Sequence, residues 1–202
     1  MRTFIALDIS PEIQDAIREA TASLRRETGS IVRWAQTENL HLTLKFLGEI
    51  SPDGVNQLTQ MLHAEAAIHV PFEMHIGGLG AFPNLKRARV IIIGIQAPVG
   101  LEALARGIES VCIRLGYAPE ARGFHPHLTI GRVKQELTAE EGSKLRRALE
   151  SSAIDSPGTA RVDSVQLYKS DLKPDGAVYT RLFSAPLKTI LAGETLQPPR
   201  HM

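Results

Sequence analysis

The tripeptide His-Leu-Thr occurs twice in this chain, at residues 41–43 and again at 127–129, although the 202 residues include only seven histidines. In both places it opens a run in which polar and apolar residues alternate, the pattern of a strand with one face on a hydrophobic core. Side chains two apart share a face, so each His and Thr should point one way and the Leu between them the other. The fold must therefore hold two strands that each display an imidazole and a hydroxyl.

Strand and helix patterns interleave in both halves of the chain, and each half carries one of the two His-Leu-Thr strands. We therefore expect an α+β fold of two pseudo-repeated strand-and-helix lobes, with one H-x-T motif from each lobe in a central cleft. A single bilobal domain should span residues 1–188, followed by a flexible tail over 189–202. The glycine-rich phosphate loops typical of nucleotide-binding folds are absent from the sequence.

Composition narrows the class of protein. Apolar residues make up 43% and charged residues 22%, as in ordinary globular proteins, and the net charge is +1. Such a chain is not a polycation, so any nucleic-acid contact should come from a local patch. The single cysteine, Cys112, excludes an internal disulfide and a thiolate metal cluster. Without a signal peptide or an apolar run of about 20 residues, we expect a cytoplasmic protein that does not enter a membrane.

Two imidazoles facing one cleft are suited to general acid–base catalysis, because their pKa values lie near neutrality. One ring would act as a base on an attacking water while the other, protonated, donates to a leaving oxygen. The threonine hydroxyls would donate to phosphate oxygens and stabilise charge that builds up at phosphorus. From the residues alone, which imidazole is the acid stays open. This chemistry needs neither metal nor cofactor, and we expect none.

Several phrases of the chain resemble one known family. "HLTLKFLGE" and "FHPHLTIGR" are similar to the paired H-x-T-x motifs of the two-histidine (2H) phosphoesterase superfamily. The nearest resemblance is to the RNA 2′,3′-cyclic phosphodiesterases, also known as 2′-5′ RNA ligases. It extends over "RTFIALDISPE", "VRWAQTENLHLTLKFLGE", "GAFPNLKRARV" and "LYKSDLKPDGAVYTRL", and ends near residue 188.

The resemblance implies a bilobal fold and hydrolysis of a terminal 2′,3′-cyclic phosphate of RNA to a 2′-phosphate, with 2′-5′ ligation as the reverse reaction. It implies that His41 is the proton donor and His127 the proton acceptor. Thr43 and Thr129 match the motif threonines and would bind the phosphate. The partner would be an RNA or oligonucleotide with a cyclic phosphate end, and we expect a monomer.

Two cations near the motifs are candidates for substrate binding. Arg132 follows the second motif, but strict alternation gives it the orientation of Leu128 and Ile130, toward the core. A long side chain at a twisted strand end can still reach the cleft, so Arg132 is a substrate-binding candidate with the alternative open. Lys45 should share the face of His41 and either reach the cleft or be solvated.

Three other interpretations are weighed against this hypothesis. His41, His125 and His127 could be metal ligands, but no carboxylate accompanies them and paired threonines have no role in a zinc site. The chain could be an RNA- or nucleotide-binding module without meaningful turnover. It could also be a phosphodiesterase for a small cyclic nucleotide or an ADP-ribose cyclic phosphate, which the motifs alone do not distinguish from an RNA enzyme.

Overall fold

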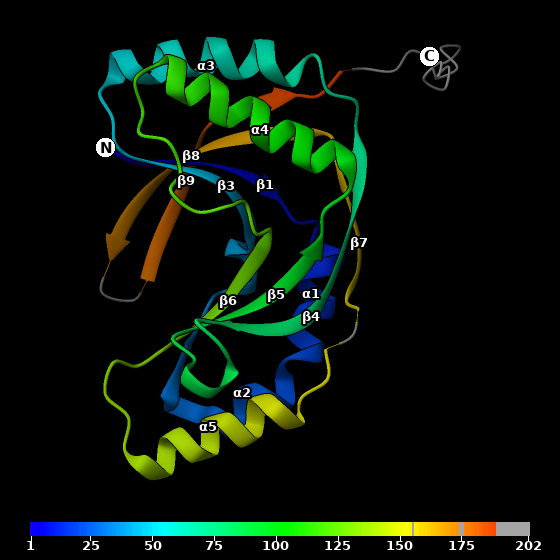
Figure 1. Ribbon diagram of the computed structural model, residues 1–202, viewed down its shortest axis with the longest axis vertical. Helices are drawn as coiled ribbons and strands as arrows, with labels where there is room; N and C mark the ends of the chain where they lie inside the picture. Colours follow the sequence, from blue (N-terminus) through cyan, green and yellow to red (C-terminus); the bar gives the residue numbers. More distant parts are fainter. Residues whose placement is uncertain (155, 174–175, 189–202) are drawn as a thin grey trace.

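The computed structural model describes residues 1–154, 156–173 and 176–188, and within them nine strands and five α-helices are present (Figure 1). The strands are β1 (Arg2–Asp8), β2 (Val32–Trp34), β3 (His41–Glu49), β4 (Phe72–Phe82), β5 (Val90–Gln96), β6 (His127–Val133), β7 (Gly158–Val162), β8 (Ser164–Lys173) and β9 (Gly176–Pro186). The helices are α1 (Pro11–Ala20), α2 (Ala22–Thr28), α3 (Pro52–Ala66), α4 (Val99–Arg114) and α5 (Ala139–Ser151). The expected tail over 189–202 lies outside the described residues.

The helices begin where the sequence carries start signals. Proline is the first residue of both α1 and α3, where its missing N–H costs no helical hydrogen bond. The Ser51 hydroxyl accepts from the N–H of Gly54 at the start of α3. Thr138 and Glu141 form the reciprocal capping box that opens α5. Local sequence therefore fixes where these helices start, and packing decides which face they bury.

All strands join one antiparallel sheet in the order β7-β4-β5-β6-β3-β1-β8-β9, with β2 paired to β6 off this path. Helices α3 and α4 pack on each other and on the β3, β8 and β9 end, while α2 and α5 pack together near β2 and α1 contacts β7 (Figure 1). We call β3, β1, β8 and β9 with α3 and α4 the first lobe. The remaining strands, with α1, α2 and α5, form the second lobe.

The expected α+β architecture with two lobes is confirmed, but the lobes are not the two halves of the sequence. Helix α4 follows β5 of the second lobe and returns to cover the first, and the last two strands also return to the first lobe. The lobes join where β3 meets β6, and the only residue pair registered between these strands within the described chain is Leu42 with Leu128. Both leucines are almost completely buried.

A continuous set of apolar side chains lies between the sheet and its helices. It includes Leu7 and Leu167 from the first lobe and Ile91, Ile93 and Ile130 from the second, each fully buried. Their burial provides the main stabilising free energy of the fold and leaves the opposite face of the central strands available for other groups. Among the described helices, none has both the length and the apolar character that crossing a membrane requires.

Candidate active site

The register at the lobe junction brings the two motifs onto one face of the sheet. Because Leu42 and Leu128 are direct antiparallel partners that point into the core, the residues on either side of each leucine point to the opposite face. His41, Thr43, His127 and Thr129 therefore surround this leucine pair on a single face, and all four are partly exposed. Continuing the register sets each histidine of one strand beside the threonine of the other.

His41 lies in a closely packed aromatic setting. Its ring stacks on Phe4 with centroids 4.7 Å apart, and Tyr179 meets it edge-on at 5.1 Å. Phe4 itself is only 3% exposed. Burial lowers the pKa of His41 below its ordinary value, while the hydrogen bond to the Asn39 carbonyl and the nearby Asp8 carboxylate act in the opposite direction. Removing the ring from water thus outweighs the two groups that favour its charged form.

His127 has a more open setting. Its aromatic neighbour is Phe82, which meets it edge-on at 5.0 Å and is itself 38% exposed. Its Nδ1 lies 2.7 Å from the carbonyl oxygen of His125. The two histidines thus share a position in their strands but differ in how far their surroundings exclude water.

Both imidazoles are held in the same tautomer. Nδ1 of His41 lies 2.8 Å from the carbonyl oxygen of Asn39, two residues earlier, just as Nδ1 of His127 lies beside the carbonyl of His125. A carbonyl oxygen only accepts, so Nδ1 must carry the hydrogen in both rings. Within the described residues neither Nε2 has a hydrogen-bond partner. Each Nε2 is therefore an acceptor when its ring is neutral and a donor when its ring is charged.

A β-bulge follows the first motif and corrects the expected alternation. Thr43 is registered with Ala6 and Lys45 with Ile5, so Leu44 is an extra residue without a partner on β1. Lys45 consequently turns to the helical side, where Nζ lies 2.7 Å from a carboxylate oxygen of Glu109 and 2.8 Å from the Ala118 carbonyl. The expectation that Lys45 reaches the cleft or is solvated is wrong, because the bulge places it in a buried ion pair.

The side chain that follows Lys45 on β3 points to the opposite face of the sheet. Phe46 is registered with Phe4, and Thr43 with Ala6. Phe4 and Ala6 are two residues apart on β1, so Phe46 shares the face of the first motif. Its side chain is 65% exposed. Without the bulge, its place in the alternation would have turned it into the core. An exposed aromatic ring therefore lies on the motif face of the first lobe.

The second motif is followed by a bulge at the equivalent residue. Thr129 is registered with Ile92 and Gly131 with Ile91, which leaves Ile130 as the extra residue. Arg132 is then registered with Val90, which lies on the same face of β5 as Ile92. The Arg132 side chain is exposed. The sequence alternation placed Arg132 toward the core, and the bulge instead puts it on the face that carries His127 and Thr129.

A cavity of about 560 Å³ opens beside His41, on the side of Asp8 and β8. Its lining includes a polar network that the sequence reasoning missed. The Tyr168 hydroxyl donates to Asp8 at 2.7 Å, and Arg181 Nη2 lies 2.6 Å from the other Asp8 oxygen. Because these residues are up to 173 positions apart, only the pairing of β1, β8 and β9 brings them together.

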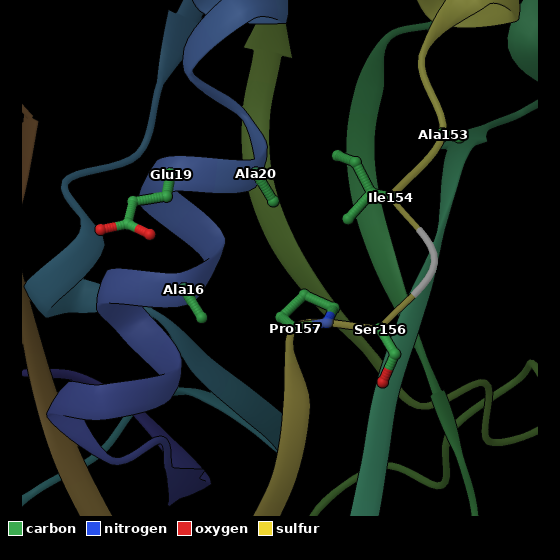
Figure 2. A pocket seen from close by; sticks show the side chains of 7 residues that line it. All are labelled: Ala16, Glu19, Ala20, Ala153, Ile154, Ser156 and Pro157. Carbon is green, nitrogen blue, oxygen red and sulfur yellow. The ribbon is translucent and has the colours of Figure 1, made fainter.

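A second hollow lies elsewhere on the molecule. A cavity of about 320 Å³ lies between α1 and a segment that includes Ala153, Ile154, Ser156 and Pro157. Figure 2 shows this segment across from α1. None of the residues that line it belongs to either motif. As for the metal interpretation, the residues that the structure describes contain no group of three His, Cys, Asp or Glu side chains placed to hold a metal ion.

The chain matches the family described as LigT like Phosphoesterase twice, over residues 7–92 and 93–179. It belongs to the LigT-like phosphoesterase family. The double match also accounts for the repeated motif, because each half of the chain contains one copy of the family pattern. The expected internal pseudo-repeat is thereby confirmed.

Curated relatives of this family carry the name RNA 2′,3′-cyclic phosphodiesterase. The Methanothermobacter thermautotrophicus protein is 31% identical over 180 residues, covering 89% of this chain and 95% of its own length. The Thermotoga maritima protein is 30% identical over 183 residues, covering 91% and 94%. These similarities extend over nearly the whole of both partners, so they concern the complete fold.

Two solved structures have the same architecture. TT0787 of Thermus thermophilus gives a TM-score of 0.78 at 28% identity, covering 93% of this chain and 98% of that one. Escherichia coli LigT complexed with 3′-AMP gives a TM-score of 0.74 at 28% identity with the same coverage. The bilobal LigT-like phosphoesterase fold is thus shared from end to end.

Proposed function

We propose that this phosphoesterase hydrolyses the 2′,3′-cyclic phosphate end of RNA to a 2′-phosphate without a metal ion. The observation that carries this proposal is the Leu42–Leu128 pair, which places two imidazoles and two hydroxyls on one face of the sheet. The names of the curated relatives, RNA 2′,3′-cyclic phosphodiesterase, support the substrate class.

In the proposed mechanism, Nε2 of His127 takes a proton from a water molecule whose oxygen attacks phosphorus. The bond between phosphorus and the 3′ oxygen breaks, and protonated His41 donates its Nε2 proton to that oxygen. The products are a 3′-hydroxyl and a 2′-phosphate, and the proton lost by His41 is balanced by the one His127 has gained. Each transfer contributes about 10²–10⁴-fold to the rate. The assignment of donor and acceptor follows the family resemblance.

The burial of His41 bears on its role as proton donor. A donor must be charged, and burial lowers the pKa of this ring in the free protein. An anionic phosphate bound beside it favours the charged form and raises that pKa. Thr43 and Thr129 would donate their hydroxyls to the non-bridging oxygens, where negative charge builds up in the transition state. Substrate binding would therefore prepare His41 for its role.

Ligation would follow the same course with a 5′-hydroxyl in place of water. His127 takes the proton of that hydroxyl as its oxygen attacks phosphorus, and His41 donates a proton to the leaving 3′ oxygen, which gives a 2′-5′ linkage and a 3′-hydroxyl. Cleavage of a 2′-5′ linkage is the reverse of this step, and there His41 accepts the proton and His127 donates it. We further propose that residues 1–188 act as one bilobal unit and that the protein is a cytoplasmic monomer. Size-exclusion chromatography with light scattering would test the oligomeric state, since a dimer would give twice the 22.1 kDa mass of the chain.

The test uses a short RNA ending in a 2′,3′-cyclic phosphate, in EDTA, with the position of the product phosphate identified. The wild type should form a 2′-phosphate, and His41→Ala and His127→Ala should each lose about 10²–10⁴-fold in kcat. His63→Ala, which changes a histidine on α3, is the matched control and should retain wild-type rates.

Three outcomes would contradict the proposal in different ways. Turnover that vanishes with EDTA and returns with zinc would replace the mechanism with a metal-dependent one. Turnover of adenosine 2′,3′-cyclic phosphate or an ADP-ribose cyclic phosphate, but not of RNA, would show that the substrate is a small molecule. Measurable RNA binding without turnover of any of these would favour a binding module.

A further inference from the structure

Strand β2 places an arginine directly opposite Arg132. Val32, Arg33 and Trp34 are registered with Val133, Arg132 and Gly131, and the two flanking valines are buried. Arg33 and Arg132 therefore project together from the opposite face, and both are exposed. Two like charges in direct cross-strand contact are destabilising, so the fold gains nothing from this pair.

Neither guanidinium is neutralised within the described part of the chain. No hydrogen bond or ion pair joins Arg33 or Arg132 to any described side chain. The first lobe differs, because its arginine near the motif, Arg181, is paired with Asp8 at 2.6 Å. On the second lobe, the motif face therefore carries two uncompensated positive charges, at Arg33 and Arg132.

The arginine pair lies at a defined distance from the motif. His127, Thr129 and Arg132 are registered with Gly94, Ile92 and Val90, which are successive residues on one face of β5. With a rise of about 3.3 Å per residue, Arg132 lies about 7 Å beyond Thr129 and about 13 Å beyond His127 along the strand. If the terminal phosphate of a polynucleotide lies between the motifs and the chain runs along β6, the next phosphate along the chain would come close to Arg132.

We propose that Arg33 and Arg132 together bind the phosphodiester that precedes the terminal nucleotide of an RNA substrate. This inference rests on the proposed function and defines the substrate as an oligonucleotide rather than a mononucleotide. Guanidinium groups suit the task because they hold phosphate oxygens through paired hydrogen bonds. A bound phosphodiester would also remove the repulsion between the two arginines. Contacts to the backbone carry no base information, so the preference is for length and not for sequence.

The experiment compares adenosine 2′,3′-cyclic phosphate with the dinucleotide ApA ending in a 2′,3′-cyclic phosphate. For the wild type, kcat/KM should be higher with the dinucleotide. Arg33→Gln and Arg132→Gln should each reduce that length preference about 10-fold, the loss expected for one charge-assisted hydrogen bond. The dependence of dinucleotide affinity on salt should also become shallower in each variant, because one charge contact between protein and phosphate is lost.

Arg146→Gln, which removes an exposed arginine from α5, is the matched control and should leave the length preference and the salt slope unchanged. Arg33→Gln should also keep or raise the urea midpoint of unfolding, because it relieves like-charge repulsion. A structural role would lower that midpoint instead. Equal loss on both substrates, or a length preference that survives the double variant, would overturn the proposal.

Failure of the proposed function is distinguishable from failure of this inference. If the wild type turned over neither cyclic phosphate, the phosphodiesterase proposal would fall. The arginine pair would still be tested by fluorescence anisotropy, with dye-labelled ApA ending in a 3′-phosphate as the probe and labelled 3′-AMP as its short counterpart. Tighter binding of the longer probe that both arginine variants abolish would support the pair, and equal binding of the two probes would contradict it.

Discussion

The two motif strands bulge at the same place, yet the residues that follow the bulge differ in kind. Four residues after the histidine, β3 carries Lys45 in a buried ion pair, whereas β6 carries Gly131 beneath the Trp34 ring. Five residues after it, β3 exposes Phe46 and β6 exposes Arg132. The two β-bulges therefore place different kinds of side chain on the motif face, an aromatic ring from the first lobe and a positive charge from the second.

The largest expected difference between the lobes concerns the rings beside the histidines. Phe4→Ala should lower the free energy of unfolding by about 3–5 kcal/mol, because it removes a buried ring that stacks on His41. Phe82→Ala, on the His127 side, should lower it by only about 1 kcal/mol, because that ring is 38% exposed and loses less buried surface. Urea titration of both variants measures the contrast. Similar losses would mean that His127 is held as firmly as His41.

The second largest difference should concern how much one ion pair of each lobe contributes to the free energy of unfolding. Lys45→Met removes a side chain that is only 3% exposed and should cost about 2–3 kcal/mol, since Glu109 loses its cation while keeping the N–H of Glu120. In the second lobe, Lys134→Met breaks a solvent-exposed pair with Glu141 and should have no measurable effect. Equal unfolding midpoints for the two variants would show that burial does not distinguish these pairs.

The Lys45 contribution should depend on pH. Burial acts to raise the pKa of Glu109, but hydrogen bonds from Lys45 and the Glu120 N–H outweigh it, so the net direction is downward. A carboxyl whose pKa is lower in the folded than in the unfolded state adds stability above its unfolded pKa and loses it as pH falls through the folded one. The difference between wild type and Lys45→Met should therefore shrink in acid, and a gap that stays constant as the pH is lowered to about 3 would contradict this.

Gly131, the counterpart of Lys45, gives a smaller expected effect. A Cβ at this position would lie 2.8 Å from Val32 Cγ1 and 3.1 Å from the Trp34 ring. Gly131→Ala should therefore destabilise the second lobe by about 1–2 kcal/mol through overpacking. Gly142→Ala on α5, where a Cβ meets nothing within 4 Å, is the control and should be neutral or stabilising. A stable Gly131→Ala protein would mean that Trp34 moves freely.

The smallest effect should be a shift in pH dependence on the His41 side. If His41 is the donor, kcat/KM falls as pH rises through its pKa in the free enzyme. Asp8→Asn removes a carboxylate that raises this pKa and leaves Arg181 uncompensated nearby, so the fall should begin at lower pH. Tyr168→Phe removes a hydrogen bond to Asp8 but no charge, and its pH profile should stay in place. A shift to higher pH in Asp8→Asn would assign that limb to another group.

Sequence alternation predicted that each motif shows its His and Thr on one face with its Leu in the core, and the register at Leu42 and Leu128 agrees. It failed immediately beyond the motifs, for both Lys45 and Arg132. A bulge depends on how a strand registers with its neighbour, and the neighbours of β3 and β6 include strands far away in sequence. No local pattern in either phrase signals the extra residue.

The network of Asp8, Tyr168 and Arg181 escaped prediction for a related reason. Each residue stands in an ordinary strand pattern, and only the tertiary pairing of the first and last strands brings them together. The helix starts at Pro11, Pro52 and Thr138 could be predicted because their signals are contained within a few residues. Contacts between residues that are close in the sequence can therefore be predicted from it, whereas contacts that depend on the pairing of distant strands cannot.

The matching tautomers of the two histidines have a consequence for consecutive turnovers. In the proposed mechanism His41 ends a cycle neutral and His127 ends it charged, so the enzyme that releases product is a protonation isomer of the one that bound substrate. The two forms interconvert only by exchanging protons with solvent. His41 must recover its proton behind Phe4 and Tyr179, whose rings pack against the imidazole. Restoring the starting form is therefore a step of the cycle that buffer concentration should accelerate.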